Sequence, residues 1–132
     1  MRRFLLTVAT AATALVGTAC GDSTGIGGNV TGSYELVRIN GRSLPVQLGT
    51  EVIEEGVLEI DSDGTFAETI WFRPVGSASS DDFTFTGTWD EDGGDIRLDY
   101  DNSTEVYFAD RRSGGRLVYE DSFGDEWEYR RF

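Results

Sequence analysis

Apolar and polar side chains alternate along several short stretches of this chain. The clearest stretch is Asp82–Trp89, in which Phe83, Phe85, Gly87 and Trp89 share one face and threonines take most of the other. A period of two residues is typical of a β-strand that buries one face. We therefore predict a strand here with its aromatic face pointing inward. The same alternation predicts inward orientation for further apolar residues, which are Ile96, Leu98, Tyr100, Leu117, Tyr119, Trp127 and Tyr129.

Similar runs recur from residue 31 to residue 132, separated by turns rich in Gly, Asp and Asn. No run of ten or more residues has a helical period, although Val52–Glu55 is interpreted as one turn of helix. Many short strands with short connections favour an antiparallel meander, and closure into a barrel removes its exposed edges. The sequence predicts an all-β meander of about eight strands that closes into a small barrel. The predicted strands are Thr31–Asn40, a weak run at Leu44–Leu48, Val57–Asp61, Thr65–Arg73, Asp82–Trp89, Ile96–Tyr100, Glu105–Ala109, Arg116–Glu120 and Glu126–Phe132.

The first 19 residues have the pattern of an export signal. Arg2 and Arg3 give it a positive start, and residues 4–16 are apolar apart from scattered threonines. Such a segment is too short to span a bilayer as a stable helix. Small residues then lead to Cys20, as a signal peptidase cleavage site requires. We therefore predict that residues 1–19 are a signal peptide.

Cys20 is the only cysteine of the chain, and it directly follows this predicted cleavage site. The position is similar to that of a lipobox cysteine, which receives a diacylglycerol and becomes the first residue of the mature protein. The alternative is an ordinary secretory signal that is cut before a cysteine. Residues 20–30 are predicted to be a lipidated flexible tether, and residues 31–132 a single domain. This organisation predicts an exported protein of the bacterial cell envelope, lipid-anchored on a periplasmic or outer face.

The mature chain is strongly acidic. The sequence holds 24 acidic and 11 basic residues, and loss of Arg2 and Arg3 with the signal leaves nine basic residues and a net charge of −15. A field of this sign repels nucleic acid and anionic lipid surfaces. We therefore expect membrane attachment through the lipid on Cys20, no nucleic-acid partner, and a monomer.

The composition excludes many catalytic mechanisms. The chain has no histidine, no lysine and only one cysteine, so it cannot build a Ser–His or Cys–His pair, a Schiff-base lysine or an imidazole metal site. Carboxylates remain, and we interpret their clusters as solvated turns rather than as a glycosidase pair. The turns at 61–64 and 90–93 lack the full ligand pattern of a calcium loop. We predict no catalytic residue, no metal site, no cofactor and no enzymatic activity.

Short motifs spread over nearly all of the mature chain carry a family resemblance. They are Gly32–Leu36, Asn40-Gly41, Leu44-Pro45, Asp63–Phe66, Gly87–Trp89 and Tyr129–Arg131. Together they resemble the bacterial lipocalin-like lipoprotein domains. The resemblance implies a small up-and-down barrel, in a family whose members mostly lack an assigned activity.

Arg38 and Glu68 are polar residues that fall on predicted apolar strand faces. Arg38 shares a face with Tyr34 and Leu36. On a later strand, Glu68 shares a face with Phe66, Ile70 and Phe72. One hypothesis is that both side chains point into the barrel and orient a small ligand. The other is an ion pair or an error in strand phase, since Val37 makes the phase of the first strand ambiguous.

Two functions fit these patterns. The favoured hypothesis is an envelope-anchored module whose barrel holds a small apolar or amphipathic ligand, with Arg38 and Glu68 as ligand-binding residues. The alternative is a structural or protein-interaction lipoprotein with a filled core and no ligand. A continuous internal cavity lined by aromatic residues favours the first, and a filled interior favours the second, because an eight-stranded barrel is narrow enough for side chains to fill.

Overall fold

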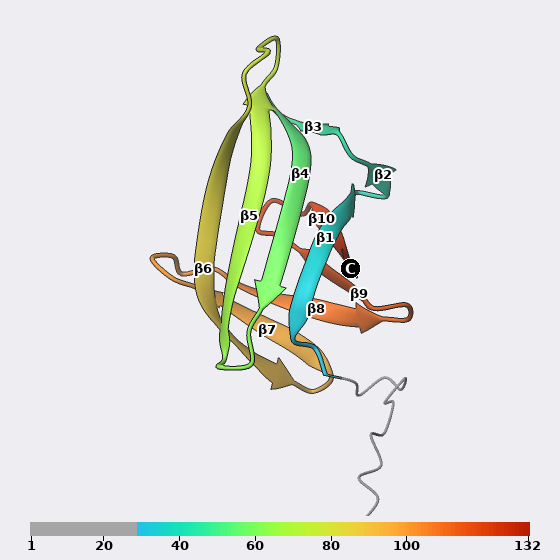
Figure 1. Cartoon of the computed structure of the whole chain (residues 1–132), viewed down its shortest axis with the longest axis vertical. Coiled ribbons are helices and arrows are strands. Elements are labelled where there is room, and N and C mark those ends of the chain that lie inside the picture. The colour runs from blue at the N-terminus through green and yellow to red at the C-terminus, as the bar shows by residue number, and fades with distance from the viewer. Residues whose placement is uncertain (1–28) are drawn as a thin grey trace, which may run out of the picture.

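The computed structural model of this protein describes residues 29–132, whose regular structure is entirely β (Figure 1). Within these residues ten strands follow one another along the chain. They are β1 (Gly32–Ile39), β2 (Arg42–Ser43), β3 (Val46–Leu48), β4 (Glu51–Ile60), β5 (Thr65–Pro74), β6 (Asp81–Asp92), β7 (Asp95–Tyr100), β8 (Val106–Arg112), β9 (Arg116–Glu120) and β10 (Glu126–Arg131).

Eight of these strands form a closed antiparallel barrel. The strands neighbour one another in the order β2-β1-β10-β9-β8-β7-β6-β5-β4-β3, and a further pairing of β1 with β4 closes the barrel. The short strands β2 and β3 extend from this seam. The predicted fold class, an all-β antiparallel meander of about eight strands that closes into a barrel, is confirmed.

Two predicted turns show why the chain reverses where it does. Asn40 and Gly41 have φ angles of 51° and 73°, and a tight two-residue hairpin requires positive φ at both central positions. At the β4–β5 turn, the Asp63 carboxylate accepts hydrogen bonds from the Thr65 backbone N–H at 3.0 Å and from its hydroxyl at 2.6 Å. This acidic residue therefore acts as a turn former.

The alternating side chains fill the closed end of the barrel. On β7, Ile96, Leu98 and Tyr100 are buried, whereas Arg97 and Asp99 are not. The inward orientation predicted for this strand is confirmed. The same is true of the buried residues Leu117, Tyr119 and Tyr129 on β9 and β10.

A close approach at Gly87 completes the packing of this end. A Cβ atom at Gly87 would lie 2.6 Å from the Phe66 ring and would also clash with the Asp99 carbonyl oxygen. The missing side chain therefore lets the buried Phe66 ring lie directly against β6. This accounts for a glycine in the middle of the aromatic face of that strand.

The first strand changes phase in its middle. A β-bulge lies between Leu36 and Arg38, opposite β10. Tyr34, Leu36 and Ile39 are consequently buried, while Arg38 is exposed. The extra residue of the bulge moves Arg38 to the outer face of the sheet, so the predicted inward face Tyr34–Leu36–Arg38 is wrong at its third position.

The segment interpreted as a helical turn is a strand. Val52 and Ile53 pair with Arg73 and Phe72 of β5, and also with β3 on the other side. A bulge follows Ile53. Hydrogen-bonded partners on both sides outweigh the weak local preference of this short stretch.

The barrel is closed at one end and splayed at the other. Strands β4, β5 and β6 have 10, 10 and 12 residues, whereas β7 has only 6. Strand β7 pairs with β6 only from Gly87 to Asp92, and β1 pairs with β4 only from Val57 to Ile60. The three long strands therefore project beyond the closed part of the barrel, as Figure 1 shows.

The packed core includes Val30, which composition assigned to the tether. Val30 is buried, and its carbonyl oxygen accepts a hydrogen bond from the Tyr34 hydroxyl at 2.6 Å. The predicted signal peptide (1–19) and Cys20, with most of the predicted tether, lie outside the described residues and stay predictions. Residues 29–132 contain no helix that is long and apolar enough to cross a membrane.

Candidate functional site

A cavity of about 750 Å³ occupies the splayed end of the barrel. Its walls come from the β3–β4 turn, the end of β5, the first half of β6, and the β7–β8 and β9–β10 hairpins. Figure 1 shows the β3–β4 region at the top of the view and the start of β1 at the bottom. Gly32 of β1 pairs with the last residue of β4, Ile60, whereas the cavity lining includes the first, Glu51. We call the exposed part of the lining, which includes Thr50, Phe83 and Glu105, the mouth of the cavity. Cavities of roughly 300–1,000 Å³ are typical of small-molecule sites.

A run of aromatic rings forms one wall of the cavity. The Tyr100 and Tyr107 rings meet edge to face at 5.3 Å between centroids. Tyr107 and Tyr119 are stacked at 5.2 Å, and Tyr119 and Trp127 are stacked at 6.3 Å. Ring packing of this kind holds each side chain in place and gives the wall a rigid apolar surface.

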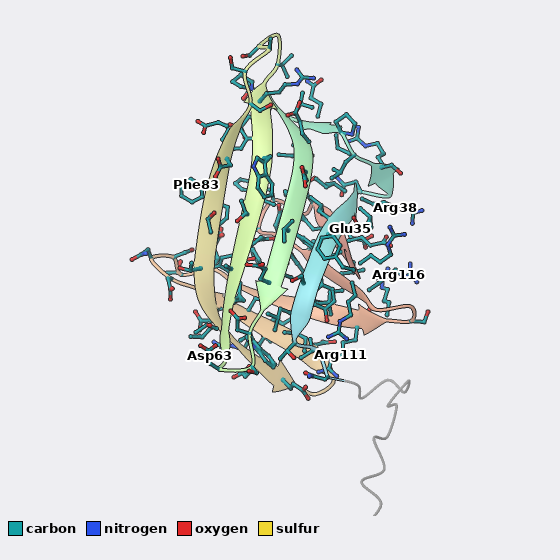
Figure 2. All side chains as sticks on the ribbon, viewed as in Figure 1. Glu35, Arg38, Asp63, Phe83, Arg111 and Arg116 are labelled. Carbon is teal, nitrogen blue, oxygen red and sulfur yellow. The ribbon has the colours of Figure 1, made fainter. Side chains whose placement is uncertain are left out.

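Phe83 and Phe85 of β6 extend this wall toward the mouth. Their rings lie 4.6 Å apart, and Phe85 meets Tyr100 at 6.1 Å. Both line the cavity, as their predicted inward orientation requires, yet they remain 56% and 43% exposed. The reason is that β7 does not reach this half of β6, so no strand within residues 29–132 covers the rings on that side. Figure 2 shows Phe83 at this edge.

Glu68 lies in the cavity wall and is only 3% exposed. Its Oε2 accepts a hydrogen bond from the Tyr100 hydroxyl at 2.7 Å. Its Oε1 accepts one from the Tyr119 hydroxyl at 2.7 Å and another from the Tyr129 hydroxyl. Three hydroxyl donors thus replace the water that this carboxylate loses on burial.

The three tyrosines remain protonated donors at neutral pH. Desolvation is the main cause that raises the pKa of each hydroxyl, and the nearby charge of Glu68 raises the pKa further for Tyr100, Tyr119 and Tyr129. Sequence reasoning placed these rings inside the barrel but did not connect them with Glu68. The sequence held one indication of this contact, because all three tyrosines and Glu68 were predicted to point into the same barrel interior.

Further carboxylates surround the mouth. The Glu105 carboxylate accepts hydrogen bonds from Tyr107 at 2.6 Å and from Ser122 at 2.8 Å, and these bonds lower the pKa of Glu105. Asp121 accepts the indole N–H of Trp127 at 2.9 Å. Six acidic residues line the cavity, and among residues 29–132 no arginine does so. The lining acids are Glu51, Glu68, Asp101, Glu105, Asp121 and Asp125.

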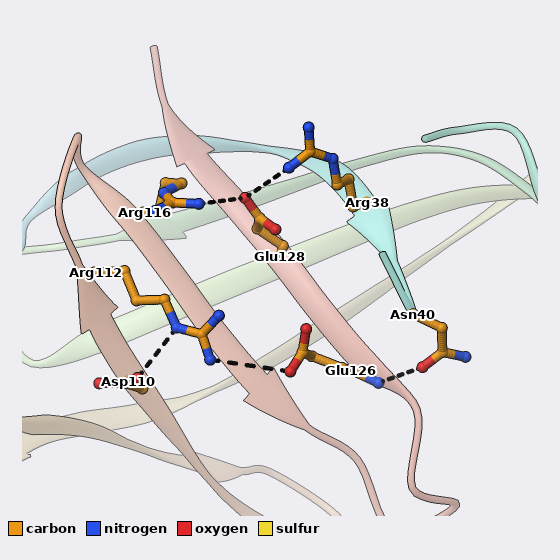
Figure 3. A network of polar contacts seen from close by, with 7 residues as sticks. All are labelled: Arg38, Asn40, Asp110, Arg112, Arg116, Glu126 and Glu128. Carbon is orange, nitrogen blue, oxygen red and sulfur yellow. Dashed lines mark hydrogen bonds and ion pairs between the residues drawn. The ribbon is translucent and has the colours of Figure 1, made fainter. Parts of the chain in front are cut away.

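Arg38 lies away from this cavity. Its guanidinium forms an ion pair with Glu128 at 3.6 Å, and its side chain is 49% exposed. Arg116 contacts the same carboxylate oxygen at 3.2 Å, so that Glu128 lies between two arginines (Figure 3). In Figure 2, Arg38 and Arg116 lie across the barrel from Phe83. The structure therefore does not bring Arg38 and Glu68 together, because the bulge in β1 turns Arg38 outward.

Residues 29–132 contain no group of three or more carboxylate, imidazole or thiol side chains placed to hold a metal ion. The site is therefore an aromatic cavity with one buried carboxylate and an acidic mouth.

Comparisons of this chain with protein-family models, curated protein sequences and solved structures found no match.

Proposed function

We propose that this protein is an envelope-anchored, lipocalin-like lipoprotein whose barrel binds a small apolar or amphipathic ligand. The observation that carries the proposal is the cavity of about 750 Å³ with its aromatic wall. Eight strands make a barrel narrow enough for side chains to fill. An interior that instead keeps this volume free favours a ligand site over the alternative, a structural lipoprotein with a filled core.

The uncovered rings at the mouth support the same function. Phe83 and Phe85 expose about half of their surface into a concave site. Each apolar Å² that a ligand covers there contributes roughly 25 cal/mol. A ligand with an apolar body would thus gain affinity from a surface that the folded chain leaves in water.

The sequence supports the membrane anchor in this proposal. The apolar segment that ends at Cys20 supports export and lipidation, and hence a place on a membrane of the cell envelope. Gly32, at the start of β1, pairs with Ile60 at the end of β4, whereas the cavity is lined by Glu51 at the start of β4. A lipid attached upstream of β1 would therefore join the barrel at the end away from this part of the cavity wall. We further propose a monomer that takes no nucleic acid as a partner and has a binding role rather than a catalytic one.

Fluorescence titration of the purified full chain with N-phenyl-1-naphthylamine, an uncharged apolar probe, tests the binding function. We expect saturable enhancement of emission with one site per chain. Phe83→Ser should weaken binding about 5- to 30-fold, the equivalent of roughly 1–2 kcal/mol of lost apolar contact. Phe108→Ser is the matched control, because Phe108 is 49% exposed but does not line the cavity.

Two results would contradict the proposal. One is no saturable binding, and the other is equal weakening by the two serine variants. Native mass spectrometry of the protein purified from its own host tests the anchor separately, because the mass would report both the lipid on Cys20 and any retained ligand.

A further inference from the structure

We propose that the ligand is a small organic cation, an amine or a quaternary ammonium with an apolar body. This inference rests on the ligand-binding function proposed above and adds the sign of the ligand's charge. It follows from three features of the cavity: the charge of its wall, the partners of Glu68, and the rings beside them.

The charge of the cavity wall has one sign. Six carboxylates line the cavity and, within residues 29–132, no arginine faces them. A concave site with low-dielectric walls concentrates the field of such groups. A carboxylate or phosphate ligand would meet this field unfavourably, whereas a cation would be drawn in.

Glu68 is a buried charge without an ionic partner. Glu128, the other buried acid, forms ion pairs with Arg38 and Arg116. Within the described residues, Glu68 is in contact with tyrosine hydroxyls but with no arginine. Hydroxyl donors satisfy hydrogen bonds but leave the negative charge uncompensated, and burial of an uncompensated charge is unfavourable. A bound cation would compensate the charge of Glu68 as the two arginines compensate that of Glu128.

Glu68 also keeps acceptor capacity for such a ligand. A carboxylate offers about four acceptor positions. Oε1 receives Tyr119 and Tyr129, while Oε2 receives only Tyr100. One acceptor position of Oε2 thus remains for an N–H donor of a protonated amine, whereas a quaternary ammonium would interact with the carboxylate through its charge alone.

The aromatic wall suits the same chemistry. A cation is attracted to the face of an aromatic ring, and sites that hold quaternary ammonium groups are commonly built from several rings. Phe83 and Phe85 have exposed surface, and Tyr107 and Trp127 are partly exposed at the two ends of the stack. The apolar body of the ligand would cover the rings, and its positive group would lie between ring faces and carboxylates.

The test compares three ligands that share one apolar body: 4-phenylbutylamine, 4-phenylbutan-1-ol and 4-phenylbutanoate. At neutral pH they carry a positive charge, no charge and a negative charge. Calorimetric titration of the full chain should give the tightest binding for the amine, at least tenfold tighter than for the alcohol, and the weakest for the carboxylate. This comparison needs no variant and thus does not depend on whether a substituted chain folds.

Glu68→Gln then locates the effect. Glutamine keeps the shape of the side chain and can still bond to the tyrosine hydroxyls, but it removes the charge. We expect the amine to lose most of its advantage over the alcohol in this variant. Glu59→Gln is the matched control, because Glu59 is an exposed acid on the outer face of β4; it should leave the advantage unchanged.

The outcomes separate this inference from the proposed function. Equal affinity for the three ligands, or tightest binding of the carboxylate, would overturn the cation and leave the apolar-ligand function standing. Binding of N-phenyl-1-naphthylamine without any binding of the amine would do the same. If neither that probe nor any ligand of the series binds, both proposals fail. An equal effect of the two glutamine variants would show that Glu68 does not recognise the positive group.

Discussion

Replacement of Glu68 by leucine is the sharpest test of the hydrogen-bond arrangement inside the barrel. The change removes the acceptor shared by three hydroxyls and leaves all three buried: Tyr100 is 7%, Tyr119 5% and Tyr129 0% exposed. A buried polar group without a partner costs about 1–3 kcal/mol. Tyr100 and Tyr119 line the cavity, where water could reach a stranded hydroxyl, so we use the lower end of that range. At about 1 kcal/mol for each of three hydroxyls, Glu68→Leu should lower the free energy of unfolding by about 3 kcal/mol.

The same reasoning predicts a rescue. Replacing the three tyrosines by phenylalanine in the leucine background removes the stranded hydroxyls together with the missing acceptor. Apolar replacement of both sides of a hydrogen bond is often close to neutral, so the fourfold variant should return to within about 1 kcal/mol of the unsubstituted chain.

Urea denaturation followed by tryptophan fluorescence measures these differences. For a domain of this size, 3 kcal/mol corresponds to a fall of very roughly 12 °C in Tm. Glu59→Leu on the outer face serves as the control and should change the stability by less than about 0.5 kcal/mol. A Glu68→Leu chain as stable as the original, or a fourfold variant no better than the single one, would refute the reasoning.

Three further predictions concern single positions. Arg38→Ala should lower the free energy of unfolding by less than about 1 kcal/mol. Double-mutant cycles measured by urea denaturation should show that Arg38 is coupled to Glu128, whereas the effects of Arg38 and Glu68 substitutions should add within about 0.5 kcal/mol. A larger coupling to Glu68 would contradict the outward position of Arg38. Burial first, and the charge of Glu68 second, raise the pKa of Tyr129 in the folded protein, so its contribution is complete below the ordinary tyrosine pKa of about 10 and is lost as the pH rises above it. Tyr129→Phe should reduce that alkaline loss, and urea midpoints that fall with the same slope in both proteins would argue against it. Cys20→Ser should abolish the lipid-modified mature form, and processed Ser variant that still fractionates with membranes would disprove the anchor.

The alternation of apolar and polar residues predicted most of the fold because strands such as β5 and β7 bury only one face. On β7, the alternation of Ile96, Leu98 and Tyr100 with charged residues predicts the observed orientation. Glu68 breaks such a pattern on β5, and it is buried on the predicted side. A polar residue that stays in phase with apolar neighbours was therefore a valid pointer to the interior.

The pattern failed where backbone irregularity decides the orientation. The bulge between Leu36 and Arg38 adds one residue. The apolar residue Val37 made the phase of β1 ambiguous, but the sequence did not show where the phase changes. The cavity could not be predicted from the sequence either, because its volume depends on how far β7 extends along β6. Strand-length mismatch between distant segments is a property of the closed sheet, and periodicity within one strand does not report it.

The two buried acids show how this chain divides its charge between stability and binding. Glu128 receives Arg38 and Arg116 across neighbouring strands, so its charge is compensated when the barrel closes. Glu68 receives only neutral donors, although residues 29–132 contain nine arginines. The net charge of −13 over the whole sequence acts mainly within the screening length of about 8 Å at physiological salt, so it favours the approach of cations without fixing one in place. In the proposed binding function, selection of a ligand is therefore left to the cavity, where Glu68 is buried, is held in position by three hydroxyls and keeps one acceptor position for a further donor.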